Sequence, residues 1–174
     1  MFSRDPLANP EPLIRRVYSY VAYRLGDGPE AEDVTSDVFE RALRYRGSYD
    51  AAKGEPVSWL LGIARTCANH ALAARPPAAV EAPDTPAPGD LERDALLRLE
   101  LREALAELTE PDLELVALRY GADLSARQIA ELLGQRTNTI EVRLHRVLER
   151  LRRRIEREEP VEPAGEPLGE GVRI

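Results

Sequence analysis

The sequence has little that suggests a secreted, membrane-bound or disulfide-stabilised protein. Its only cysteine is Cys67, so no intrachain disulfide can form, and this usage is typical of a reducing compartment. No apolar run approaches the roughly 20 residues of a membrane span. The first twelve residues lack the apolar stretch of a signal peptide. We therefore expect a cytoplasmic protein with no membrane insertion, in which Cys67 is a core residue.

The sequence also lacks the constellations on which enzymes depend. It contains no phosphate-binding glycine loop, no H-E-x-x-H motif and no cysteine cluster. Asp33 and Asp37 are four residues apart on an expected helix and could share a cation, but no histidine or further carboxylate completes a shell. A solvated or partner-facing surface is the favoured interpretation of this pair. We therefore expect no catalytic site, no metal and no cofactor.

No segment shows a convincing strand pattern, and the sequence predicts an all-α fold. Aromatic residues make up only 5% of the chain, and its apolar side chains are mostly Leu, Ala and Val, which suit helices. Residues 76–90 contain five prolines in fifteen positions, which predicts an extended linker between two helical blocks. The tail from residue 158 is acidic and rich in Pro and Gly, and we expect it to be disordered.

Apolar spacing of three and four residues predicts three helices before the linker and a helix over about residues 91–108 after it. A further helix begins at Thr109, which with Asp112 has the pattern of a capping box. The expected inward-facing positions are Leu13, Val17, Val21 and Leu25; Val34, Val38, Ala42 and Tyr45, with Phe39 and Leu43 beside them; Leu60, Ile63, Ala64, Cys67 and Ala71; and Leu113, Val116, Ala117 and Tyr120.

Residues 124–148 carry the strongest functional signal. Ser125 and Gln128 form the S-x-x-Q version of a capping box, and Gly134 lies where a helix end favours a left-handed residue. A second helix from about residues 137–139 is expected to bury Ile140, Leu144, Val147 and Leu151 and to expose Arg143, Arg146 and Arg150. This pattern is typical of a helix-turn-helix that places one helix in the DNA major groove. The alternative is an αα-hairpin whose charges are only solvated.

The charge distribution resolves an apparent conflict with DNA binding. The net charge of the chain is −7, yet residues 136–157 hold eight arginines and only three glutamates. The acidity lies in the linker and the tail. Because phosphate neutralisation supplies much of DNA affinity, such a modest local excess predicts weak binding alone. A partner that supplies further DNA contacts is therefore expected.

Four segments in this order resemble the extracytoplasmic-function sigma factors of bacterial RNA polymerase. They are AEDVTSDVFERALRY (31–45), SWLLGIAR (58–65), LTEPDLELVALRY (108–120) and SARQIAELLGQRTNTIEVRLHRVLERL (125–151). The resemblance implies a sigma-two domain over residues 11–75 and a linker over 76–91. A sigma-four helix-turn-helix domain follows over 92–157, and the acidic tail is 158–174.

The resemblance also implies which part of the chain binds each partner. The second helix would dock on the β′ clamp helices of core RNA polymerase, with the β flap as a further contact. The loop before Trp59 and the third helix would capture unstacked minus-ten bases, and the second domain would contact the minus-thirty-five duplex in the major groove. An anti-sigma factor is a further partner that the family implies.

The resemblance assigns a set of residues to each partner. Core polymerase is assigned Asp33, Ser36, Asp37, Glu40, Arg41 and Arg44; minus-ten DNA is assigned Tyr49, Lys53, Trp59, Arg65, Thr66, Asn69 and His70; minus-thirty-five DNA is assigned Arg136, Thr137, Asn138, Glu141, Val142, Arg143, His145 and Arg146. From the residues alone, Trp59 is more simply a core anchor than a stacking platform.

Several positions depart from the family pattern, and two alternative functions stay open. Ser36 stands where the family usually has Gln, and Glu141 and Val142 stand where basic and small polar residues are common. These changes are compatible with an altered promoter sequence or with a sigma-like protein of reduced promoter binding. A stand-alone helix-turn-helix regulator is the other alternative, although it has no need for a mixed-charge helix over residues 33–46.

Overall fold

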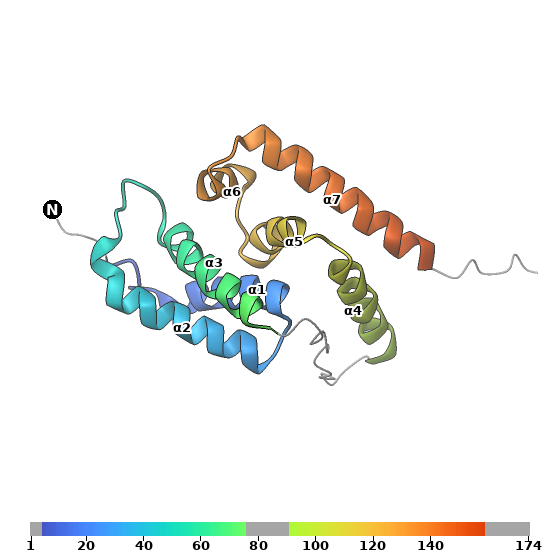
Figure 1. Cartoon of the computed structure of the whole chain (residues 1–174), viewed down its shortest axis with the longest axis horizontal. Helices are drawn as coiled ribbons and strands as arrows, with labels where there is room; N and C mark the ends of the chain where they lie inside the picture. The colour runs from blue at the N-terminus through green and yellow to red at the C-terminus, as the bar shows by residue number, and fades with distance from the viewer. Residues whose placement is uncertain (1–4, 76–90, 159–174) are drawn as a thin grey trace, which may run out of the picture.

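A computed structural model describes residues 5–75 and 91–158 of the chain. Within these ranges all regular structure is helical, with seven α-helices, one 3₁₀ turn and one π turn (Figure 1). This confirms the predicted all-α class. The predicted linker and the predicted disordered tail lie almost entirely outside the described residues.

The first block consists of α1 (Pro10–Leu25), α2 (Pro29–Tyr45) and α3 (Pro56–Ala74), with a 3₁₀ turn at Arg46–Ser48. All three helices have a proline in the first turn, where its missing N–H costs no hydrogen bond. Gly26 and Gly28 have positive φ angles of 92° and 132°, which lets the chain reverse between α1 and α2. These three elements match the helices expected from apolar spacing.

The core of this block follows most of the predicted positions but departs from them on α2. Val38 and Ala42 are fully buried, whereas Leu43 and Tyr45 are more than half exposed. Leu43 lies about 100° further around the helix than Ala42, and Tyr45 is the last residue of α2. The expectation that these two side chains join the core is therefore wrong.

The second block consists of α4 (Leu91–Ala106), α5 (Glu110–Val116), a π turn at Ala117–Gly121, α6 (Ala126–Leu133) and α7 (Thr137–Glu158). The predicted capping box is present: the Gln128 backbone N–H donates to Ser125 Oγ at 3.2 Å, and the Ser125 N–H donates to Gln128 Oε1 at 2.9 Å. Gly134 ends α6 with φ of 64°. Ile140, Leu144, Val147 and Leu151 are buried. The helix-turn-helix geometry is thus confirmed.

Two local expectations for α5 are wrong. The Thr109 hydroxyl makes no capping bond to the helix, and the Asp112 carboxylate binds Arg143 and Arg150 of α7. Tyr120 is 48% exposed, whereas Leu115 and Leu118 are fully buried. The π turn explains the second error, since its wider winding shifts the register on which a 3.6-residue period depends.

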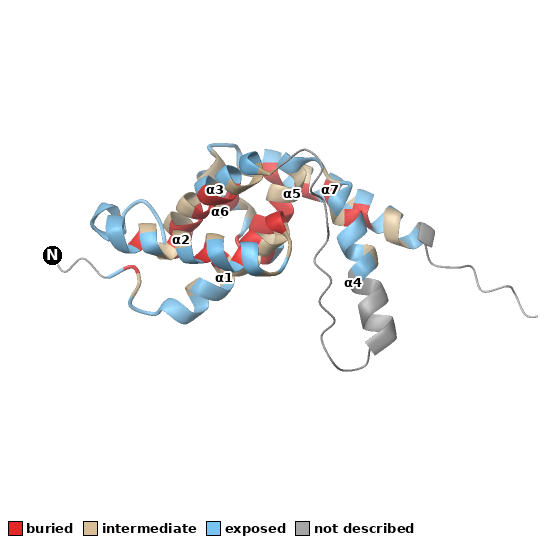
Figure 2. Cartoon of the chain, turned by 60° about the horizontal axis from the view of Figure 1, so that its bottom comes forward, coloured by how far each residue is buried: buried red, intermediate tan, exposed pale blue. Residues whose placement is uncertain are grey.

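The two blocks do not stand apart. Buried residues of α1 and α3, including Tyr20 and Leu60, share one core cluster with Leu115, Leu118 and Ile129 of the second block. Figure 2 shows the buried residues gathered along α1, α2 and α3 and at their junction with α5. A smaller cluster of Ala104, Val116, Val147 and Leu151 joins α4, α5 and α7. The picture of two modules held only by a tether is therefore incomplete.

Candidate nucleic-acid and polymerase interfaces

The start of α7 and the turn before it present an open polar surface. Six of the eight residues assigned to minus-thirty-five DNA are exposed, namely Arg136, Asn138, Glu141, Val142, His145 and Arg146. Among the described residues, neither Arg136 nor Arg146 forms an ion pair. The buried positions Ile140, Leu144 and Val147 fix the opposite side of the helix against the core. This surface is therefore preformed, and no other part of residues 5–75 and 91–158 covers it.

Arg143 is held differently from its neighbours on α7. Its Nη2 lies 3.5 Å from Oδ1 of Asp112, and its side chain is 29% exposed. Arg150 donates to the other carboxylate oxygen of Asp112. Partial burial raises the pKa of Asp112, but hydrogen bonds from Arg150, Thr109 and Arg143 outweigh it, so this pKa lies below its ordinary value. Asp112 therefore fastens α7 to the start of α5.

The residues assigned to minus-ten DNA fall into two groups. Thr66, Asn69 and His70 are exposed on α3. Arg65 is half-buried on the same helix, and its Nε donates to Glu114 Oε1 of α5 at 2.7 Å. Tyr49, Lys53 and Trp59 lie apart from these, around a cavity at the loop that precedes α3.

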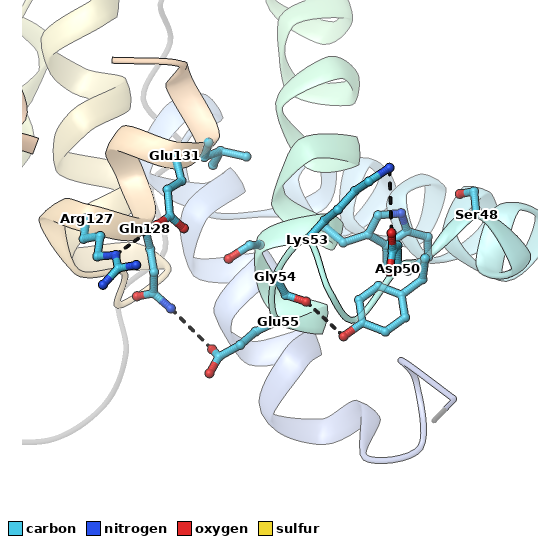
Figure 3. Close-up of a pocket in the computed structure, with 12 residues that line it drawn as sticks. Ser48, Asp50, Lys53, Gly54, Glu55, Arg127, Gln128 and Glu131 are labelled. Carbon is cyan, nitrogen blue, oxygen red and sulfur yellow. Dashed lines mark hydrogen bonds and ion pairs between the residues drawn. The ribbon is translucent and has the colours of Figure 1, made fainter. Parts of the chain in front are cut away.

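That cavity has a volume of about 460 Å³ and lies between the loop over residues 48–55 and α6 (Figure 3). The Tyr49 and Trp59 rings pack with centroids 5.7 Å apart and planes tilted by 59°. The Tyr49 hydroxyl donates to the Gly54 carbonyl at 3.0 Å, which fixes the loop. Trp59 both packs against the core and lines the cavity, so the two interpretations of this residue are not exclusive.

The outer face of α2 carries the residues assigned to core polymerase. Asp33, Ser36, Glu40 and Arg44 are exposed, and two ion pairs run along the helix: Arg41 with Asp37 at 3.0 Å and Arg44 with Glu40 at 2.8 Å. The Ser36 hydroxyl donates back to the Glu32 carbonyl at 3.0 Å. The face is thus charged, mixed in sign and internally ordered.

Cys67 of α3 lies beneath this face, beside Asp37. Burial raises the pKa of Asp37, but hydrogen bonds from Arg41 and Cys67 outweigh it, so that pKa lies below its ordinary value. Burial and the neighbouring Asp37 raise the pKa of the Cys67 thiol to about 11. Cys67 is 3% exposed, which confirms its predicted place in the core. Across the described ranges, no three side chains of His, Cys, Asp and Glu gather as metal ligands.

Residues 11–75 match the family described as Sigma-70 region 2, and residues 98–151 match Sigma-70, region 4. The RNA polymerase sigma factor CarQ of Myxococcus xanthus is 32% identical over 146 residues, which cover 79% of this chain and 81% of that protein. The ECF RNA polymerase sigma factor SigK of Mycobacterium ulcerans is 29% identical, over 79% of this chain and 78% of that protein. The chain belongs to the extracytoplasmic-function sigma factors.

A longer relative matches over part of its length. The ECF RNA polymerase sigma factor BldN of Streptomyces coelicolor is 30% identical over 79% of this chain, which spans 55% of that protein. The predicted family is therefore confirmed, with region 2 on α1–α3 and region 4 ending within α7. As a sigma factor, the chain acts in transcription initiation with core RNA polymerase and promoter DNA.

Two solved structures share the fold of this sigma factor. The RpoE chain in a complex with the anti-sigma factor NepR from Bartonella quintana has a TM-score of 0.66 and 18% identity, covering 84% of this chain and 94% of that chain. CnrH, in complex with the cytosolic domain of CnrY, has a TM-score of 0.58 and 19% identity, covering 86% of this chain and 83% of that chain.

Over residues 5–75 and 91–158, no helix has the length and apolar character needed to cross a bilayer.

Proposed function

We propose that this sigma factor selects promoters through two separate DNA contacts while α2 binds core polymerase. Region 4 contacts the minus-thirty-five duplex, and region 2 captures unpaired minus-ten bases. The observation that carries this proposal is the exposed polar start of α7 behind the Ser125 and Gly134 caps, on the same chain as the aromatic-lined loop of region 2.

The α7 surface has the chemistry for base recognition in a major groove. Arg146 and Asn138 offer donors for guanine and adenine edges, and Arg136 lies in the turn where a phosphate contact is expected. Glu141 is able to accept from cytosine N4, and Val142 to meet a thymine methyl group. These two residues support an unusual promoter sequence rather than a loss of sequence recognition.

The region 2 loop has the chemistry for single-stranded DNA. Aromatic faces stack on unpaired bases of any sequence, and Tyr49 and Trp59 provide two such faces beside Lys53. Thr66, Asn69 and His70 add exposed polar groups along α3. Binding to unpaired bases favours strand separation, since duplex DNA offers no exposed base faces there.

The α2 face supports docking on the β′ clamp helices, because charges of both signs give orientation as well as attraction. The β flap is the proposed contact of region 4. In this scheme the polymerase performs the chemistry and this chain is not an enzyme; it works in the cytoplasm, where the polymerase and the chromosome are. An anti-sigma factor is proposed as the partner that keeps the chain from the polymerase.

The test is transcription by core polymerase supplemented with the full chain on genomic DNA, followed by sequencing of transcript 5′ ends. We expect new start sites that share upstream and downstream boxes. Arg146→Ala should reduce them, whereas Arg152→Ala, an exposed arginine of the same helix paired with Glu156, should not. Absence of stable core binding would identify a stand-alone regulator. Activity on premelted templates alone would identify a protein with weak promoter melting.

A further inference from the structure

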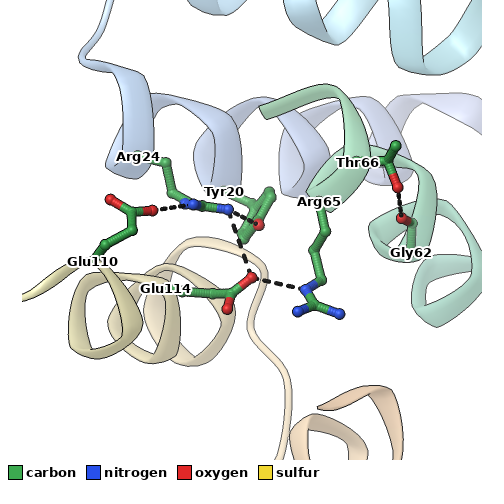
Figure 4. A network of polar contacts seen from close by, with 7 residues as sticks. All are labelled: Tyr20, Arg24, Gly62, Arg65, Thr66, Glu110 and Glu114. Carbon is green, nitrogen blue, oxygen red and sulfur yellow. Dashed lines mark hydrogen bonds and ion pairs between the residues drawn. The ribbon is translucent and has the colours of Figure 1, made fainter. Parts of the chain in front are cut away.

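A polar network crosses the junction between region 2 and region 4 (Figure 4). Arg24 of α1 donates to Glu110 of α5 and lies 3.5 Å from Oε1 of Glu114. The same Glu114 oxygen accepts from Arg65 of α3 at 2.7 Å. One carboxylate of region 4 therefore binds two arginines of region 2.

Arg24 is the buried element of this network. Its side chain is only 2% exposed, and its Nη1 donates to the Tyr20 hydroxyl at 2.9 Å. Burial raises the pKa of Tyr20 to about 12, so this hydroxyl stays neutral. A buried guanidinium is stable only when it is paired, and both of its carboxylate partners come from region 4. If the two regions separate, Arg24 loses both carboxylates and becomes exposed to water, which can solvate its charge.

The backbone makes the junction specific. Arg16 of α1 donates to the carbonyls of Ala122 and Asp123 at 2.6 and 2.9 Å. Gly121 packs so closely on α1 that a Cβ atom there would lie 3.0 Å from the Ser19 carbonyl oxygen and 3.0 Å from the Tyr23 ring. These contacts can form in only one orientation of region 4 on α1. The junction is therefore a specific interface.

Region 4 covers two parts of the proposed minus-ten surface. Glu114 of α5 forms an ion pair with Arg65. Its carboxylate thus occupies the guanidinium group that a DNA phosphate would otherwise bind. On the other side, α6 forms one wall of the cavity that holds the Tyr49 and Trp59 rings, and Gln128 Nε2 donates to Glu55 Oε2 at 3.3 Å. The packed arrangement therefore restricts access to Arg65 and to the cavity between Tyr49, Trp59 and α6, whereas Thr66, Asn69 and His70 stay exposed.

The packed arrangement is also too short for a promoter. The two boxes are centred about 25 base pairs apart by their names, which is ~85 Å of duplex at a rise of ~3.4 Å. A compact chain of this length has a radius of gyration of about 16 Å. The two regions must therefore separate before both boxes are bound.

We propose that Arg24, Arg65, Glu110 and Glu114 form a clasp that holds the free sigma factor closed. In this state Glu114 competes with DNA for Arg65, and the clasp opens when the chain engages polymerase and promoter. The competition with DNA rests on the proposed minus-ten function of Arg65, whereas the closed state itself does not.

The test uses the full chain and the substitution Glu114→Gln, which keeps the side-chain shape and removes the charge. Glu11→Gln is the matched control, because among the described residues Glu11 pairs only with exposed Arg15 on α1. Small-angle X-ray scattering measures opening, and fluorescence anisotropy measures binding to a labelled 20-nucleotide single strand of mixed sequence. We expect Glu114→Gln to increase the radius of gyration and to raise single-strand affinity by about tenfold, with no change for Glu11→Gln. Adding Arg65→Ala to Glu114→Gln should remove the gain in affinity but not the expansion.

Gly121→Ala is the second opening variant, since it disturbs the junction without altering charge; circular dichroism verifies that each variant keeps its helices. A wild-type chain that already scatters as two separated domains overturns the clasp without any variant. Folded Glu114→Gln and Gly121→Ala proteins that scatter like the wild type also overturn it. Expansion without any gain in single-strand binding supports the clasp and overturns the proposed role of Arg65.

Discussion

The arginines proposed to contact DNA are held differently in region 2 and in region 4. Arg146 of region 4 is exposed on α7, whereas Arg65 of region 2 is bound by a carboxylate of the other region. Arg143 is intermediate, because Asp112 of its own region holds it. An exposed arginine is ready for DNA at once, whereas a bound one requires that its protein partner leave first. In the proposed scheme, Arg146 is therefore available to duplex DNA before Arg65 is available to the unpaired strand.

The largest expected effect is the loss of promoter affinity when the exposed Arg146 is substituted. Arg146→Ala should weaken holoenzyme binding to a promoter duplex by about 10- to 100-fold if a base contact is lost. Electrophoretic mobility shift with the mapped promoter measures it, and thermal unfolding should be unchanged because Arg146 forms no ion pair within the described residues. Wild-type affinity and sequence preference in this variant would remove Arg146 from the recognition surface.

The helix proposed to bind core polymerase, α2, should show the next largest effect. Arg41→Glu reverses a charge and places two carboxylates together at the Asp37 pair, so we expect core affinity to fall by about three- to tenfold. Competition with labelled wild-type sigma for core polymerase measures this affinity. Arg15→Glu makes the same change at an exposed ion pair on α1 and serves as the control. Equal affinities for both variants would argue against the α2 face.

Substitution of Arg143, which Asp112 binds, should lower both the stability of the chain and its binding to DNA. Arg143→Ala leaves Asp112 with one arginine, and we expect the free energy of unfolding to fall by about 1 kcal/mol. Urea unfolding measures this loss, and the mobility shift should change less than for Arg146→Ala. A variant with full stability and a larger binding defect than Arg146→Ala would reverse the assigned roles of the two residues.

The smallest effect concerns pH. The pKa values of Asp37 and Asp112 lie below their ordinary values in the folded chain. The folded state therefore binds these protons more weakly than the unfolded state. Their stabilising contribution is present above about pH 4 and is lost as pH falls through the folded pKa values. Urea unfolding at neutral and acidic pH measures the loss, and Asp112→Asn should flatten the slope. An unchanged slope in that variant would exclude Asp112 as a source.

Features with local causes could be predicted from the sequence. The Ser125 capping box and the Gly134 helix end depend on residues within a few positions of each other, so a short stretch of sequence is enough to predict them. The region 2 helices could also be predicted, because Val17 and Val21 on α1, and Val38 and Ala42 on α2, are buried pairs at helical spacing. Family resemblance supplied the assignment of partners, and the residue roles remain predictions.

Features with distant causes could not be predicted. Arg24 and Glu110 are 86 positions apart, and each looks like a solvated charge on its own amphipathic helix. Asp112 was misassigned for the same reason, since its partners Arg143 and Arg150 lie on another helix. Tyr120 was misplaced because a π turn leaves no signature in hydrophobic periodicity.

The burial of Cys67 makes the chain convenient for spectroscopy. Its thiol is shielded beneath α2 and, with a pKa of about 11, is almost entirely protonated at neutral pH. Maleimide and iodoacetamide dyes react with thiolates, so they should spare this position. A cysteine introduced at an exposed site of either region can then be labelled selectively in the otherwise native chain. Distances between dyes on the two regions can thus be followed during assembly with polymerase.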